Sequence, residues 1–120
     1  TYVGSNKTTP NYNVMGVAKA ALETSVKYLS VDLGKHNIRV NAISAGPMKT
    51  IAGAAISGAR HVYRYSEKIA PLQKNPDLEQ VGNAALYLLS DISSGVTGLT
   101  HYVDGGLKVV GIPNQDMVNI

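Results

Sequence analysis

Tyr12 and Lys19 stand seven positions apart in the stretch PNYNVMGVAKAALETSVKYL, which covers residues 10–29 and opens an amphipathic helical pattern. Seven residues turn an α-helix through about 700°, so a helix that reaches back to Tyr12 would place both side chains on one face. A nearby ammonium group favours the phenolate and lowers the pKa of a tyrosine. Such a phenol can donate a proton or a strong hydrogen bond to a developing oxyanion. The plainer alternative, which spacing alone favours, is a tyrosine packed on the core and a lysine in solvent.

Gly16 lies between these two residues on the same predicted helix face. A glycine inside a helix costs about 1 kcal/mol relative to alanine, so it needs a compensating benefit. We expect the benefit to be the close approach of a flat group, such as a cofactor ring or a ribose.

Composition restricts the class of protein. The chain has 120 residues, the size of one small domain, and its net charge of +3 is too small to indicate a nucleic-acid partner. No apolar run approaches the roughly 20 residues that span a bilayer, so we expect no membrane partner. The absence of cysteine excludes disulfides and thiolate metal sites, and fits a cytoplasmic protein. The chain opens at Thr1 without an initiator methionine, and we expect it to be a fragment or to be separated from an N-terminal part.

The order of predicted elements is helix, strand, helix, strand, which is typical of an α/β domain with parallel strands. We expect a loop over 1–11, a helix over 14–34, a strand over 38–44, broken helices over 48–70, a helix over 77–90 and a strand over 99–103. Asp77 and Gln80 form a plausible capping box, and the tail after 106 has no clear pattern. Two strands do not make a stable parallel sheet, so these strands need partners from missing N-terminal strands.

Each long helix has one face of apolar or small residues. On the first helix the predicted face contains Ala18, Ala21, Leu22, Ser25, Val26, Leu29 and Leu33. On the helix over 77–90 it contains Val81, Ala84, Ala85, Leu88 and Leu89. One face would pack on the sheet and leave another for a neighbouring subunit.

The order of Tyr12, Lys19, the strand IRVNAISAGPMKT, a helix and then TGLTHYVDGG resembles the C-terminal half of the short-chain dehydrogenase/reductase family. PNYNVMGVAKAALE together with NAISAGPMKT resembles the bacterial enoyl-acyl-carrier-protein reductases, which are NADH-dependent enzymes of type II fatty acid synthesis. Ordinary superfamily members carry a tyrosine four residues before the lysine, where this sequence has Met15. This departure argues against a ketoreductase, because a phenol one turn back suits the more distant thioester oxygen of an enoyl substrate.

The resemblance implies a doubly wound, Rossmann-like parallel sheet, with the whole of residues 1–120 forming the C-terminal half of one reductase domain. It implies that Tyr12 hydrogen-bonds the enolate oxygen, as proton donor or as oxyanion stabiliser. Lys19 would bind the nicotinamide ribose hydroxyls, and Tyr2 would be a second active-site tyrosine. The alternative for Tyr2 is a loop aromatic that packs locally.

The resemblance also implies a cofactor loop and a substrate loop within about 48–70. The cofactor NAD(H) would contact Gly46, Met48, Lys49, Thr50, Ile51 and Ala52, unless this stretch is a plain strand-to-helix turn. The acyl chain would lie against Met15, Ala52, Ala55 and Ile56, unless residues 52–66 form a loosely packed surface helix.

Three cations at four-residue spacing, Arg60, Arg64 and Lys68, predict a basic helix face. It could dock the strongly acidic acyl carrier protein, although a solvated face is the plainer interpretation. His36, His61 and His101 lack metal-ligand spacing, and His101 is expected to be a packing residue.

No glycine-rich dinucleotide loop is present, and neither is the residue that selects NAD or NADP. We therefore expect the N-terminal half of the same protein to act as a partner. The family also implies a homotetramer. Two alternatives stay open: a divergent short-chain reductase of another carbonyl or enone, and an inactive fragment that serves as an assembly module.

Overall fold

The computed structural model describes residues 1–118. The helices and strands, in chain order, are α1 (Asn13–Gly34), β1 (Ala42–Ala45), α2 (Ile51–Ala54), α3 (Ala59–Ile69), α4 (Leu78–Leu89), β2 (Thr100–Val103) and α5 (Gln115–Val118). Single 3₁₀ turns occur at Val3–Ser5, Asp91–Ser93 and Leu107–Val109. Among the described residues, no helix combines the length and the apolar character that crossing a membrane requires.

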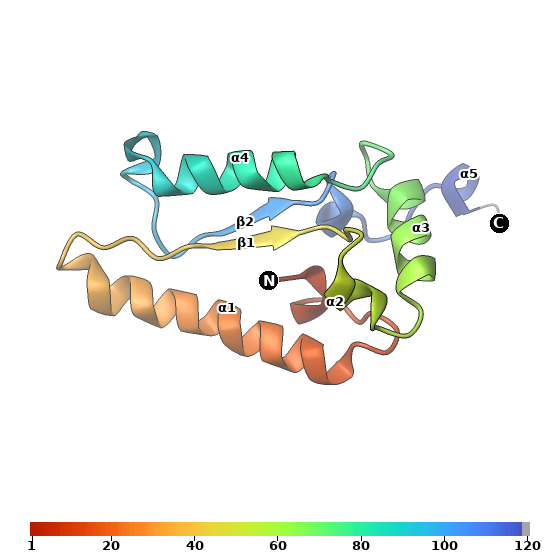
Figure 1. The fold of residues 1–120 in the computed structure, drawn as a ribbon, viewed down its shortest axis with the longest axis horizontal. Coiled ribbons are helices and arrows are strands. Elements are labelled where there is room, and N and C mark those ends of the chain that lie inside the picture. Colours follow the sequence, from red (N-terminus) through yellow and green to blue (C-terminus); the bar gives the residue numbers. More distant parts are fainter. Residues whose placement is uncertain (119–120) are drawn as a thin grey trace.

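The two strands lie side by side between two long helices. β1 and β2 run parallel, with Ala42 opposite Thr100 and Ala45 opposite Val103. Figure 1 shows α1 on one side of this pair and α4 on the other, with α2 and α3 beyond the ends to which both arrows point. This arrangement confirms the predicted α/β class with parallel strands. It also gathers the carboxyl ends of both strands at one edge, next to α2 and α3.

Helix α1 begins at Asn13, one residue before the predicted start at 14, and it buries only a few residues. Tyr12 is the residue that precedes the helix, and the first helical residue is Asn13. The buried residues of α1 are Gly16, Val26 and Ser30. Most of the apolar face predicted for α1 is exposed in this chain; the exposed members are Ala18, Ala21, Leu22, Ser25 and Leu29.

Helix α4 agrees better with its sequence. The Asp77 carboxylate accepts from the Gln80 backbone N–H at 2.8 Å, and the Gln80 side chain accepts from the Asp77 N–H at 3.1 Å. The predicted capping box is therefore confirmed. Leu88 is buried as expected, whereas Leu89 is 84% exposed and does not belong to the packed face.

The first strand is shorter than the predicted 38–44, because hydrogen bonds from side chains hold the residues before it. The Arg39 guanidinium donates to Ser93 Oγ at 3.0 Å and to the carbonyl oxygens of Ser90 at 3.1 Å and Val96 at 3.2 Å. Asn41 accepts from the Leu99 N–H at 3.0 Å. These bonds fasten the approach to β1 onto the connection between α4 and β2.

Residues 48–70 form the broken helices that their glycines predict, with α2 and α3 separated at Gly58. Gly58 has a φ of 81°, in the left-handed region that glycine tolerates. The tail contains the turn at Leu107–Val109 and the short helix α5, neither of which its sequence indicated. The apolar core consists of Val3, Ile69, Ala70 and Leu107. These residues come from the first loop, the end of α3 and the turn after β2.

Candidate active site

Tyr12 and Tyr2 form an aromatic pair where the first loop meets α1. Tyr12 is only 7% exposed. The ring centroids are 5.2 Å apart and the ring planes are inclined at 72°, an edge-to-face arrangement. Such pairs contribute about 0.5–1.5 kcal/mol beyond their buried area. The structure therefore brings together the two tyrosines that the family resemblance singled out.

Two glycines make this pair possible. A β-carbon at Gly16 would lie 2.7 Å from the carbonyl oxygen of Gly4, and a β-carbon at Gly4 would lie 2.7 Å from Cε1 of Tyr12. The loop backbone thus packs directly onto α1 and under the Tyr12 ring. The expectation that Gly16 admits a cofactor is wrong, because the backbone of Gly4 occupies that space.

Burial controls the acidity of both phenols. Desolvation raises the pKa of Tyr12 above its ordinary value, so the expected lowering by a nearby cation is also wrong. Desolvation raises the pKa of Tyr2 as well, and the neighbouring Tyr12 adds to the rise, while a hydrogen bond with Thr9 opposes it. Both groups are therefore neutral phenols at physiological pH. A neutral phenol can donate a hydrogen bond to a developing oxyanion, which a phenolate cannot do.

The Glu23 carboxylate holds the loop against α1. It accepts hydrogen bonds from Ser5 Oγ at 2.6 Å, from Thr1 Oγ1 at 2.8 Å and from Asn6 Nδ2 at 3.3 Å. Partial burial raises the pKa of Glu23, but these hydrogen bonds and the positive amino group of Thr1 outweigh burial and hold it below its usual value. The loop that carries Tyr2 is thereby anchored at three points to the helix that follows Tyr12.

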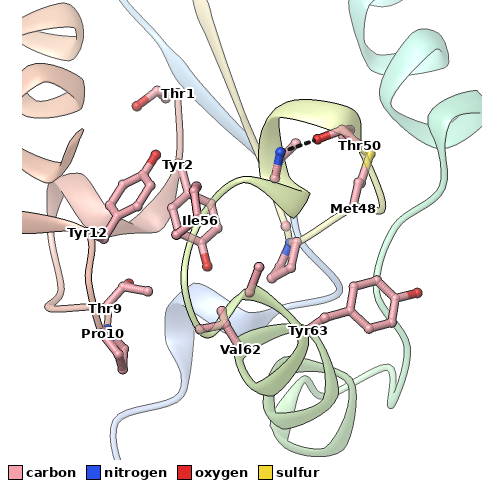
Figure 2. A pocket seen from close by; sticks show the side chains of 15 residues that line it. Thr1, Tyr2, Thr9, Pro10, Tyr12, Met48, Thr50, Ile56, Val62 and Tyr63 are labelled. Carbon is pink, nitrogen blue, oxygen red and sulfur yellow. Dashed lines mark hydrogen bonds between the residues drawn. The ribbon is translucent and has the colours of Figure 1, made fainter.

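A cavity of about 240 Å³, which we call the tyrosine pocket, opens beside this pair. Figure 2 shows Tyr12 on one side of it, with Tyr2 next to Tyr12, and Met48 and Thr50 on the other side. The pocket is lined by the first loop, by the segment after β1 and by one face of α3; its residues are Thr1, Tyr2, Thr9, Pro10, Tyr12, Ala45, Gly46, Pro47, Met48, Thr50, Gly53, Ile56, Ala59, Val62 and Tyr63.

The expected site residues divide into two groups. The pocket brings together Tyr2, Tyr12, Gly46, Met48, Thr50 and Ile56. It does not include Met15, Lys19, Lys49, Ile51, Ala52 or Ala55. Met15, expected to line the acyl slot, is 44% exposed, and Ile51, expected to contact the cofactor, is 96% exposed. Lys49 places its ammonium 5.1 Å from the centre of the Tyr63 ring.

Lys19 is half-buried on α1, two turns after Tyr12. In Figure 2 the Tyr12 hydroxyl points toward Thr1, which also lines the tyrosine pocket.

Backbone contacts explain why the segment after β1 has a glycine at position 46 and a threonine at position 50. Gly46 donates to the Val103 carbonyl at 2.8 Å, and a β-carbon on it would lie 2.8 Å from Cδ of Pro76. Thr50 caps α2, with Oγ1 accepting from the Gly53 N–H at 2.9 Å, as the dashed line in Figure 2 marks. These contacts fix the small-residue floor of the pocket at the carboxyl end of β1.

Several pocket residues were not predicted from the sequence. Ala59, Val62 and Tyr63 share one face of α3 at spacings of three and four residues, a signal that was available but was read only for its cations. Thr9 and Pro10 lie just before Tyr12, and no sequence pattern distinguishes them from an ordinary loop.

The remaining polar candidates lie elsewhere. Arg60, Arg64 and Lys68 are all exposed along α3, so the basic face exists. His61 stacks on Tyr65, and His101 packs 6.2 Å from Tyr87 between ring centroids, as expected of a packing residue. Within residues 1–118, no group of three or more His, Asp or Glu residues is placed to hold a metal ion.

The sequence matches known proteins along its whole length. The family model described as Enoyl-(Acyl carrier protein) reductase matches residues 1–108. The enoyl-[acyl-carrier-protein] reductase [NADH] 1 of Rhizobium meliloti is 58% identical over all 120 residues, which cover 44% of that protein. The enoyl-[acyl-carrier-protein] reductase [NADH] FabI of Rickettsia typhi is 58% identical over 111 residues, 92% of this chain and 42% of that one. The chain thus spans less than half the length of these relatives.

Solved structures agree in fold. FabI from Candidatus Liberibacter asiaticus superposes with a TM-score of 0.91 at 54% identity, covering 95% of this chain and 44% of that one. The enoyl-(acyl-carrier-protein) reductase of Anaplasma phagocytophilum, solved in complex with NAD, gives a TM-score of 0.90 at 52% identity over 100% of this chain and 44% of that one. The expected Rossmann-like fold, present here in part, is confirmed. The chain belongs to the enoyl-(acyl carrier protein) reductase family.

Proposed function

We propose that this chain forms the substrate half of an enoyl-acyl-carrier-protein reductase of type II fatty acid synthesis. The reaction would transfer a hydride to the β-carbon of a trans-2-enoyl thioester and a proton to its α-carbon. The observation that carries the proposal is the pair of neutral phenols, buried Tyr12 and half-buried Tyr2, beside a cavity at the carboxyl end of a parallel strand. Open α/β sheets bind their ligands at that end.

Tyr12 stabilises the charge that develops on the thioester oxygen. Its raised pKa keeps the hydroxyl proton in place, so the group donates a hydrogen bond to the enolate oxygen as negative charge accumulates there. Tyr2 packs edge-to-face against Tyr12, which fixes the orientation of the Tyr12 ring without consuming its hydroxyl. Aliphatic groups of Ile56, Ala59 and Val62 line the pocket and would contact the substrate.

NAD(H) fits the segment that follows β1. Ala45, Gly46, Pro47, Met48 and Thr50 all line the tyrosine pocket, so a nicotinamide ring bound there would contact this segment. When bound, NADH supplies the hydride of the reaction. Lys19 would hold the ribose hydroxyls, and Lys49, Ile51 and Ala52, which lie outside the pocket, would contact the cofactor beyond the nicotinamide.

Partners follow from the same proposal. The chain would work with the N-terminal half of the same protein, which supplies the glycine-rich nucleotide loop. The basic face of α3, Arg60, Arg64 and Lys68, would receive acidic acyl carrier protein. A homotetramer would cover exposed apolar residues of α1 and α4, including Val17, Leu22, Val31, Leu86 and Leu89. The complex would act in the cytoplasm.

The test is NADH oxidation with crotonyl thioester, measured in the full-length reductase that contains this chain and in its Tyr12→Phe variant. Turnover by the parent and its loss in the variant support the proposal. NADH binding without turnover in the parent would contradict it and favour the assembly module. Reduction of ketones in place of enoyl thioesters would favour the divergent short-chain reductase.

A further inference from the structure

A second cavity adjoins the tyrosine pocket. This cavity, the tail pocket, measures about 350 Å³ and lies between the first loop, α3 and the residues that follow β2. Its apolar lining comes from all three segments and includes Val3, Val62, Tyr65, Ile69, Leu107 and Val110. The tail therefore contributes to a cavity that no sequence pattern predicted.

The two cavities share a wall. Tyr2, Thr9, Pro10 and Val62 line both of them. In Figure 2 the Tyr2 ring stands between Tyr12 and the α3 side of the pocket, and its hydroxyl points toward Val62. The Tyr2 and Val62 side chains therefore stand between the two cavities.

The Lys7 ammonium at the tail pocket is engaged with the protein. It donates to the carbonyl oxygens of Lys108 at 2.6 Å and Val110 at 2.7 Å. Because this ammonium is already hydrogen-bonded and most of the lining residues are apolar, the cavity suits an alkyl chain better than an anionic ligand.

The tyrosine pocket alone is small for its proposed task. Sites for small molecules usually enclose about 300–1,000 Å³, and the tyrosine pocket falls below that range. A nicotinamide ring and an enoyl thioester would fill it, so the methylenes of a long acyl chain need another apolar space. The tail pocket supplies that space directly across the shared wall.

We propose that the tail pocket receives the distal end of a long-chain enoyl substrate, and that Tyr2 and Val62 form the passage through which the chain enters. This inference rests on the proposed reductase function and extends it to chain length. Residues after β2 would then act in substrate selection, and long substrates would bind with more buried methylenes than short ones.

The test compares kcat/KM for dodecenoyl and crotonyl thioesters in the full-length reductase. Val110→Trp fills the tail pocket, and we expect it to lower the dodecenoyl-to-crotonyl ratio about tenfold, the loss that corresponds to roughly two methylene groups returned to water. Val109→Trp is the matched control, because Val109 is adjacent, is 79% exposed and lines neither cavity. The control should keep the parental ratio.

Val62→Ala provides a second and independent measurement, which decides the matter if Val110→Trp does not fold. Removing the shared side chain widens the passage, so the ratio should rise severalfold. A parental ratio in the folded Val110→Trp variant, or in Val62→Ala, would overturn the proposal. Failure of the proposed function looks different, because the parent enzyme would then reduce neither thioester.

Discussion

The carbonyl oxygen of Gly4 rests where a side chain at Gly16 would project, because a β-carbon there would lie only 2.7 Å away. This contact joins the loop that carries Tyr2 to the helix that follows Tyr12. The geometry of the aromatic pair therefore depends on a position that has no side chain and touches no substrate.

Gly16→Ala should destabilise the protein although alanine favours helices. We expect a loss of about 1–3 kcal/mol in the free energy of unfolding, since the methyl group displaces the loop backbone. Gly82→Ala is the control, because a β-carbon at Gly82, inside α4, would meet nothing within 4 Å. That variant should gain up to about 1 kcal/mol. Equal effects on the two melting temperatures would refute the role assigned to Gly16.

Tyr12→Phe should slow turnover by about 100- to 1,000-fold and leave NADH binding nearly unchanged, because it removes one hydrogen-bond donor from the oxyanion. Steady-state kinetics and a cofactor titration measure the two quantities. Tyr28→Phe is the control, since Tyr28 lies on the same helix and is 71% exposed. Parallel losses of turnover and of NADH affinity in Tyr12→Phe would assign Tyr12 a structural role.

Glu23 should make stability depend on acidity. Its folded pKa lies below the ordinary value, so its contribution is complete above the unfolded pKa of about 4.3 and disappears as the pH falls through the folded pKa. Glu23→Gln should therefore reduce the acid dependence of the free energy of unfolding, because glutamine does not titrate. Unfolding curves at several pH values measure it, and Glu67→Gln, an exposed carboxylate on α3, controls for net charge. If the free energy of unfolding falls at low pH in Glu23→Gln as much as in the parent, the prediction is wrong.

Reversing charge on α3 should weaken recognition of acyl carrier protein. The double variant Arg60→Glu and Arg64→Glu is expected to raise KM for the carrier-protein substrate about tenfold and to spare a short thioester analogue. Lys27→Glu and Lys35→Glu, both on exposed positions of α1 or its end, form the matched control. Identical losses with both substrates would remove the docking role from α3.

Local signals predicted the parts of the fold that depend on near neighbours. The Asp77 capping box was readable because both partners lie within one turn. The packed face of α1 was not readable, because apolar periodicity reports which residues are apolar and not which element covers them. Leu22 and Leu29 are exposed, while Gly16 and Ser30 are buried, since a loop backbone and a turn pack closely there.

In the candidate site too, local motifs were predicted from the sequence and long-range contacts were not. Tyr2 and Tyr12 were identified through their motif, and the structure places both at one cavity. Val62 and Val110 were missed, because their role depends on α3 and the tail meeting the first loop across long sequence separations. The pKa of Tyr12 was misjudged for a related reason: spacing reveals a nearby cation but not the desolvation that outweighs it.

The hydrogen bonds of the Arg39 guanidinium constrain the order in which the chain folds. It bonds to oxygen atoms of Ser90, Ser93 and Val96, which are more than fifty positions later. The approach to β1 cannot settle until α4 has formed and its following turn has arrived. Closing so long a loop is entropically costly, so we expect strand pairing to be a late and slow event of folding, following the rapid formation of the two long helices.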